Sequence, residues 1–274
     1  MRLKSTTIVA LLVLLLVPQV ALADAGNPCG GKAMNPCGGK AMNPCGEKAT
    51  VSSCAMPAVN PCHAKMGTVF YIADPMQRNT VTFKSEAPLE DIVGTTNQIS
   101  GYVVMDPANP DQGGRGKIIV PVAGLNTGIP LRDEHLRGAD WLDAENYPTI
   151  ELQIDEVKDI EVVKESSSFT TYSMTLVGAF SLHGKTKKMR IPATVTFLPH
   201  SKRTESKLPG DLLAGRASFE VSLKDFGVKG FDGAIGSKVG ETIGLDVSFT
   251  ATNDKPAEVN AGNPCGGKTA KHRS

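Results

Sequence analysis

The chain has 274 residues, a formal net charge of +1 and 41% hydrophobic residues, which is enough for one large β domain or two small ones. This charge balance excludes a strongly basic nucleic-acid-binding protein, because such a protein carries an excess of Lys and Arg on one face.

Residues 1–23 are predicted to be a signal peptide. Arg2 and Lys4 provide a positive start, residues 8–17 form an apolar run, and residues 21–23 read as a small-x-small cleavage site. The apolar run is shorter than the roughly 20 residues of a spanning helix, and no later stretch approaches that length. We therefore expect an exported protein, in the periplasm, with no transmembrane segment in the mature chain.

A short cysteine motif recurs through residues 24–67 and returns in the segment 255–274. Its copies are NPCGGKAM at 27–34 and 35–42, NPCGEKAT at 43–50, NPCHAKMG at 60–67 and NPCGGK at 263–268. Asn-Pro, Cys-Gly and Gly-Gly are turn dipeptides, and the repeats offer little apolar surface to bury. Both segments are therefore predicted to be largely disordered.

The six cysteines all lie in these two segments, and two interpretations of them stay open. They are Cys29, Cys37, Cys45, Cys54, Cys62 and Cys265. Their spacing is not CxxC, which excludes a zinc ribbon or a thioredoxin-like site. Export permits disulfides of no fixed pairing. Alternatively, thiolates beside the thioethers of Met34, Met42, Met56 and Met66 form a ligand set that selects Cu(I), or the lysines that follow most motifs make the thiols redox-active.

Residues 68–254 are predicted to form the folded domain, and it begins with strands. The first strands are expected near 68–73, 79–84, 97–105 and 116–122. The next element is an insert at 131–147, LRDEHLRGADWLDAENY, which carries the only tryptophan of the chain. Residues 131–137 can form about two helical turns, and Gly138 is expected to cap them in the left-handed conformation. We expect this insert to lie as a flap over the mouth of a β-structure.

Strand alternation resumes after the insert. Residues 150–155, 171–182, 189–197, 219–223 and 243–249 each alternate apolar and polar side chains, which is typical of antiparallel strands with one wet face. HGKTKK at 183–188 predicts a tight hairpin between two of them. The fold class expected is all-β, an antiparallel sheet of about eight strands closed into a barrel that can hold one small ligand.

Several segments resemble the YceI-like family of exported polyisoprenoid-binding proteins. They are MDPANP, the LNTG of 125–128, RDEHLRGADWLDAENYPTIEL, FSLHGKTKKMRI and LKDFGVKG. The resemblance implies a lipocalin-like barrel whose apolar interior holds an isoprenoid or a similar lipid, for example a quinone.

By periodicity alone, the apolar face of the strands is an ordinary core; only the resemblance makes it a cavity wall. On that basis the candidate ligand-binding residues are Leu131, Trp141, Leu142, Met174, Leu176, Phe180, Leu182, Ile191, Val195, Phe197, Phe219 and Val221. Arg132 and His135 are candidate head-group contacts, because a guanidinium suits phosphate. The alternative for the Arg132–His135 cluster is a solvated helix face with an intrahelical Asp133–Arg137 pair.

The leading hypothesis is a non-enzymatic exported protein that binds a lipid chain for sequestration or transport. The alternative is a copper-binding or redox-responsive protein that acts through its cysteine repeats. A third hypothesis, a hydrolase or transferase acting on lipid head groups, rests only on the Arg132–His135 cluster, beside which the sequence places no nucleophile or metal set. The lipid's identity and the oligomeric state are left open.

Overall fold

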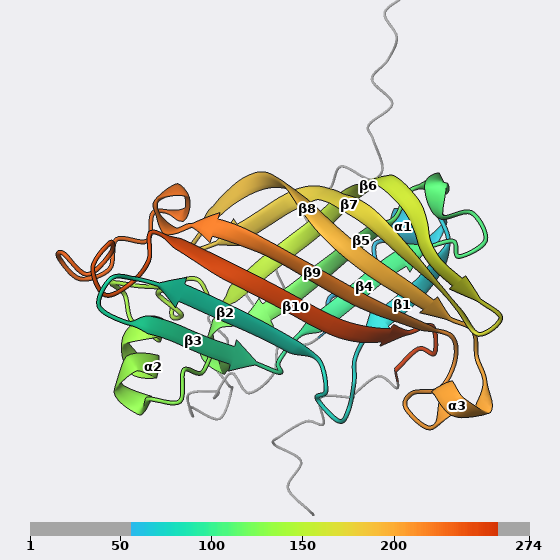
Figure 1. The fold of residues 1–274 in the computed structure, drawn as a ribbon, viewed down its shortest axis with the longest axis horizontal. Helices are drawn as coiled ribbons and strands as arrows, with labels where there is room; N and C mark the ends of the chain where they lie inside the picture. Colours follow the sequence, from blue (N-terminus) through green and yellow to red (C-terminus); the bar gives the residue numbers. More distant parts are fainter. Residues whose placement is uncertain (1–55, 257–274) are drawn as a thin grey trace, which may run out of the picture. The chain divides into compact units, whose positions relative to one another are not determined.

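The computed structural model describes residues 56–256, which form one antiparallel sheet of ten strands with a few short helices (Figure 1). The strands are β1 (Thr68–Ile72), β2 (Thr80–Glu86), β3 (Asp91–Thr96), β4 (Ser100–Met105), β5 (Arg115–Pro121), β6 (Thr149–Ser166), β7 (Phe169–Leu182), β8 (Lys185–Leu198), β9 (Leu212–Ser222) and β10 (Thr242–Thr252). The helices are α1 (Pro61–Ala64), α2 (Pro130–Arg137) and α3 (Lys202–Glu205), with 3₁₀ turns η1 (Pro110–Gln112), η2 (Val122–Gly124) and η3 (Leu223–Phe226).

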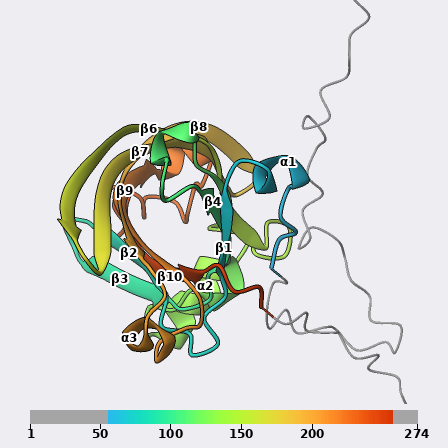
Figure 2. The same cartoon turned by 90° about the vertical axis from the view of Figure 1, so that its right-hand side faces the viewer.

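Eight of the strands close into a ring, which is visible end-on in Figure 2. The order is β1-β4-β5-β6-β7-β8-β9-β10, and β10 pairs back onto β1 where Tyr71 meets Thr252. The β2–β3 hairpin continues the wall by pairing β2 with the first half of β10, and Thr95 of β3 bridges to Asn126. Closure removes most free strand edges. The predicted antiparallel barrel is confirmed. Most of its two predicted disordered ends lies outside the described residues, but residues 61–64 of the N-terminal segment form α1.

The predicted hairpin at 183–188 is also confirmed. Leu182 pairs with Lys185, which leaves His183 and Gly184 as a two-residue turn. Both have positive φ, 50° and 71°, as a type I′ turn requires. This geometry matches the right-handed twist of the flanking strands, so β7 and β8 pair along almost their whole length.

The predicted helical insert is confirmed as α2, but the prediction for its end was wrong. Gly138 has φ −70° and ψ 167°, an extended conformation and not a left-handed cap. The chain turns back instead through the Gly138 carbonyl, which accepts hydrogen bonds from the backbone N–H of Trp141 at 3.1 Å and of Asp143 at 2.9 Å. Asp143 carries the positive φ of 47°. This turn folds Trp141 back toward the barrel.

One strand was missed by the sequence analysis. β3 follows β2 after a four-residue turn, and its inward positions are Ile92, Gly94 and Thr96. Only one of these three is a large apolar residue, so the alternation is weak. The ring of Phe83 lies against Gly94; an added Cβ would come within 2.1 Å of that ring, which would then have to move.

Candidate ligand cavity

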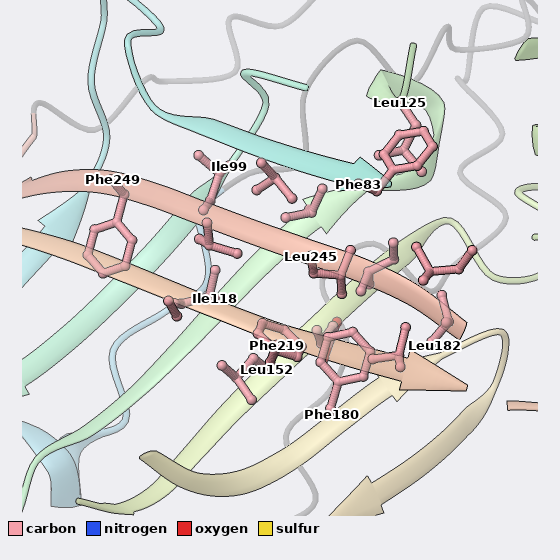
Figure 3. Close-up of a pocket in the computed structure, with 18 of the residues that line it drawn as sticks. Phe83, Ile99, Ile118, Leu125, Leu152, Phe180, Leu182, Phe219, Leu245 and Phe249 are labelled. Atoms are coloured by element: carbon pink, nitrogen blue, oxygen red, sulfur yellow. The ribbon is translucent and has the colours of Figure 1, made fainter. Parts of the chain in front are cut away.

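The barrel encloses a cavity of about 550 Å³, which lies within the usual range for small-molecule sites. Its wall consists of the inward-facing side chains of the strands, and Figure 3 shows residues such as Leu245, Ile118 and Phe219 pointing from different strands into one space. The lining is almost entirely aliphatic and aromatic. Such a lining excludes charged groups but suits a hydrocarbon chain.

The interior is hollow and not filled by its own side chains. The inward row of β10, Ile243 to Phe249, is only partly buried although the barrel wall surrounds it. By contrast, Phe70 and Ile72 of β1 are 0% exposed. The inward side chains of β10 therefore face the cavity, whereas those of β1 are packed against other side chains.

The packed residues form a floor at the end of the barrel where β1 meets the ends of β8 and β10. Phe70 packs edge-on against Phe197, with ring centroids 6.3 Å apart. The hydroxyl of Tyr172 donates to the carbonyl of Pro107 at 3.3 Å, which ties β7 to the loop between β4 and β5. Neither Phe70, Phe197 nor Tyr172 lines the cavity, although Pro110 and Gly114 of the loop between β4 and β5 do.

The opposite end is the mouth, and three segments surround it: the β2–β3 turn at 87–90, the insert at 126–147 and the loop at 227–241. Each contributes at least one lining residue. The ring of Phe231 packs edge-on against Trp141 at 5.9 Å and against His135 at 5.1 Å. Leu131 is 62% exposed and Phe231 44% exposed. The expected flap is therefore present, and a second loop, which the sequence analysis did not assign to the site, completes it.

The charged residues of α2 make three different kinds of contact. Arg132 lines the mouth and forms an ion pair with Glu90, Nη2 to Oε2 at 2.9 Å. Asp133 is only 5% exposed and accepts from the backbone N–H and the hydroxyl of Thr127 at 2.7 and 2.6 Å. Nη1 of Arg137 donates to the carbonyls of Ala123 and Leu125.

The interpretation of this cluster as a solvated face is therefore wrong for Asp133, which is part of the packed structure. Burial alone would raise the pKa of the Asp133 carboxyl, but the hydrogen bonds from Thr127 and the positive charges of Arg137 and Arg132 bring it below its ordinary value. The carboxylate joins the start of α2 to the segment before it. The side chains of Arg132 and His135, by contrast, reach the cavity mouth.

Most of the predicted lining residues are at the cavity wall. They are Leu131, Trp141, Leu142, Met174, Leu176, Phe180, Leu182, Val195, Phe219 and Val221. Ile191 and Phe197 are not. Ile191 is 1% exposed and so has no surface that faces the cavity, and Phe197 belongs to the floor.

The structure adds lining residues that the sequence analysis did not name. They include Phe83, Ile99, Ile118, Val120, Ile150, Leu152, Phe231, Val239, Ile243, Leu245, Val247 and Phe249. Several of these stand in strands that were recognised, so alternation marked their apolar face. For the loop residue Phe231, the only signal was an aromatic side chain in the Gly-rich run GFDGAIG.

Cys62 is the one predicted metal or redox residue within the described part of the chain, and it is disulfide-bonded. It follows Asn60 and Pro61, and the Asn60 side chain accepts from the Cys62 N–H at 2.9 Å. Asn60 and His63 both contact the Tyr102 hydroxyl, at 3.2 and 3.1 Å. Within residues 56–256 no group of three or more His, Cys, Asp or Glu is placed to hold a metal. Cys29, Cys37, Cys45, Cys54 and Cys265 lie outside these residues.

Comparison with known proteins agrees with this architecture. The sequence profile of the YceI-like domain matches residues 71–251, which is more than half of the chain. The chain belongs to the YceI-like family. It is 30% identical over 193 residues to a UPF0312 protein of Pseudomonas savastanoi pv. phaseolicola, covering 69% of this chain and 89% of that one. A UPF0312 protein of Pseudomonas putida W619 is 30% identical over 166 residues, covering 60% and 75%.

Two solved structures are similar to this chain. BcnA of Burkholderia cenocepacia has a TM-score of 0.51 at 19% identity and covers 66% of this chain and 100% of its own. A polyisoprenoid binding domain from Saccharophagus degradans has a TM-score of 0.49 at 12% identity and covers 68% and 98%. At these identities the likeness concerns the fold alone. In the segment 56–256 no helix has the length and apolar character needed to span a bilayer.

Proposed function

We propose that this YceI-like protein binds one isoprenoid or similar lipid chain inside its barrel. The observation that carries the proposal is the hollow interior, a cavity of about 550 Å³ with an almost wholly apolar wall. An unfilled apolar cavity forgoes the contacts that a packed core would make. A hydrocarbon chain restores them, and each buried methylene contributes about 0.8 kcal/mol.

The arrangement of the cavity favours a long chain that enters from one end. Packed side chains such as Phe70 fill much of the floor, although Pro110 and Gly114 of the loop between β4 and β5 also line the cavity there. The mouth is bordered by loops and by the exposed side chains of Leu131 and Phe231. A lipid would place its tail toward the floor and its head group near Arg132 and His135. We further propose that the protein is exported and sequesters or transports this lipid in the periplasm, as the predicted signal peptide suggests.

Trp141 allows a direct test, because it is the only tryptophan of the chain and lines the mouth. Titration of the purified protein with decylubiquinone, a quinone that quenches indole fluorescence, should give saturable quenching at one molecule per chain. Native mass spectrometry of protein purified from the periplasm should show a bound lipid. A protein that arrives empty and takes up neither decylubiquinone nor a polyprenol would contradict the proposal.

Two variants make this test specific to the cavity. Ala217 lines the cavity on β9 and pairs with Ala193 of β8, so Ala217→Phe should fill the space and abolish quenching. Ser218, the next residue, faces outward and is exposed. Ser218→Phe should leave quenching unchanged, which separates occupation of the cavity from a general effect of an added aromatic ring.

A second candidate function is thiol chemistry or copper binding by the cysteine repeats, and one observation favours thiol chemistry: Cys62 is disulfide-bonded. Removal of residues 24–66 and 256–274, which contain all six cysteines, should then abolish copper uptake or reactivity toward oxidants while lipid binding persists. Equal behaviour of the shortened and the full chain toward copper and oxidants would exclude this candidate.

A further inference from the structure

The mouth of the cavity contains charged side chains that bear on which lipid head group fits there. We propose that the cargo carries an uncharged head group, such as that of a quinone or a prenol, and that Glu90 selects against phosphorylated isoprenoids. This inference rests on the proposed function, because it concerns the head group of a lipid held in the same cavity.

Glu90 and Arg132 meet across the mouth from separate elements. Glu90 ends the β2–β3 turn, Arg132 lies in the first turn of α2, and both line the cavity; Figure 1 shows α2 beside the β2–β3 hairpin. Their Oε2 and Nη2 atoms are 2.9 Å apart. An isolated guanidinium would be a good phosphate ligand, but here a carboxylate already occupies it.

Arg137 and Lys238, two other cations near the mouth, offer no free guanidinium in place of Arg132. Arg137 directs Nη1 at the carbonyls of Ala123 and Leu125. Lys238 reaches the mouth, but an ammonium binds phosphate only as a point charge. Across the insert at 126–147, acidic residues outnumber basic ones.

At this mouth a phosphate or diphosphate would therefore lose water and gain no uncompensated guanidinium in return. Arg115 also lines the cavity, but it stands at the start of β5, toward the opposite end. The desolvation of an unpaired charge is costly, and Glu90 adds repulsion. A quinone carbonyl or a prenol hydroxyl needs only one hydrogen bond. Arg132 has further N–H groups that can supply it while the ion pair with Glu90 stays intact.

The test compares two probes that share one tail, geranylgeraniol and geranylgeranyl diphosphate, in competition for the full-length protein by native mass spectrometry. The wild type should prefer geranylgeraniol. Glu90→Gln keeps the size of the side chain but frees the guanidinium, so the preference should shift toward the diphosphate by about tenfold or more, given the strength of charge interactions at a few ångström.

Two further variants identify the cause of any shift. Glu86 stands on the same hairpin and pairs with Lys84, but it does not line the cavity. Glu86→Gln changes the net charge equally and should not alter the preference. Glu90→Gln combined with Arg132→Gln should return the preference to that of the wild type, because the freed guanidinium is then absent.

The outcomes separate the inference from the proposed function. Uptake of both probes with no effect of Glu90→Gln, or a wild type that prefers the diphosphate, overturns the inference and leaves lipid binding standing. An equal shift in Glu86→Gln also overturns it, since net charge would then be the cause. Failure of every variant and of the wild type to bind either probe overturns both.

Discussion

Asp133 demonstrates how one carboxylate in a charged helix can be structural while its neighbours face a cavity. In the run RDEH, Asp133 is buried and holds Thr127 by two hydrogen bonds, whereas Arg132 and His135 reach the mouth. Because the helix turns 100° per residue, adjacent charges point in different directions. The position of the flap therefore depends on Asp133 more than on the residues beside it.

Replacement of Asp133 by alanine should lower the free energy of unfolding by about 1–3 kcal/mol, since two donors of Thr127 lose their acceptor. Glu134→Ala, at the exposed neighbouring position, should change it by less than about 0.5 kcal/mol. Urea denaturation followed by circular dichroism measures both. Equal effects of the two changes would mean that the Thr127 contacts contribute nothing.

The same carboxylate predicts a dependence of stability on pH. The pKa of Asp133 is lower in the folded protein than its ordinary value of 3.8, so the ionised form stabilises the fold above that value. This stabilisation is lost as the pH falls through the folded pKa. The stability difference between the wild type and Asp133→Asn should thus be constant near neutrality and shrink below about pH 4; a difference that grows in acid would contradict the assignment.

At the scale of elements, a bulge in β6 shapes the longest hairpin of the barrel. The register between β6 and β7 shifts between Ile154 and Glu156, and Gly178 of β7 faces this shift. A Cβ on Gly178 would lie 2.0 Å from the carbonyl oxygen of Gln153. Only glycine permits the two backbones to approach this closely, so the bend of β6 depends on one missing side chain.

Gly178→Ala should therefore destabilise the barrel by about 1–3 kcal/mol or more, because the obstructing atom belongs to the backbone and cannot swing aside. Gly244 of β10 is a matched control, as an added Cβ there meets only the Lys84 carbonyl oxygen at 3.8 Å. Gly244→Ala should be neutral or stabilise by up to about 1 kcal/mol. Thermal and urea denaturation compare the two, and a harmless Gly178→Ala would show that the bulge is not constrained.

At the scale of the whole molecule, we expect the packed floor of the barrel to contribute more to stability than the side chains that line the cavity. The floor around Phe70 is packed, while Phe219 is only partly buried and lines the cavity. Phe70→Ala should cost about 3–5 kcal/mol, as for a packed core. Phe219→Ala should cost clearly less in lipid-free protein, because its ring already faces space. Equal losses would indicate that the cavity is filled.

The disulfide at Cys62 raises a second question at this scale, namely whether the fold depends on it. The large buried apolar residues lie in the strands and loops of residues 68–252. Burial inside the barrel should therefore provide most of the free energy of folding. We predict that reduction with dithiothreitol barely shifts the melting temperature, and that limited proteolysis leaves a core that begins between residues 55 and 70. A loss on reduction of about 2–5 kcal/mol would instead mean that the disulfide of Cys62 secures the barrel. In that case we would propose Cys265 as its partner, because the two cysteines flank the barrel in the sequence.

Local patterns in the sequence determined most of the architecture. The alternation of β6 to β10, the His183-Gly184 turn and the short helical insert each depend on interactions between residues close in the chain. Strand periodicity reports which side chains share a face, and turn chemistry reports which strands are joined. These signals were sufficient for an antiparallel barrel with a flap. They failed for the end of α2 at Gly138 and for β3, where glycine and threonine replace apolar residues at inward positions.

Only the tertiary structure decided that the apolar face surrounds space. Periodicity marks Phe180, Phe197 and Phe219 alike, yet Phe197 is packed against Phe70 while the other two line a cavity. The difference depends on how far apart opposite walls stand, which the closure of the whole ring sets. The pairing of Arg132 with Glu90 joins residues 42 positions apart, and no local pattern reports it. Contacts between distant segments arise when the ring closes, and they determine what the mouth can bind.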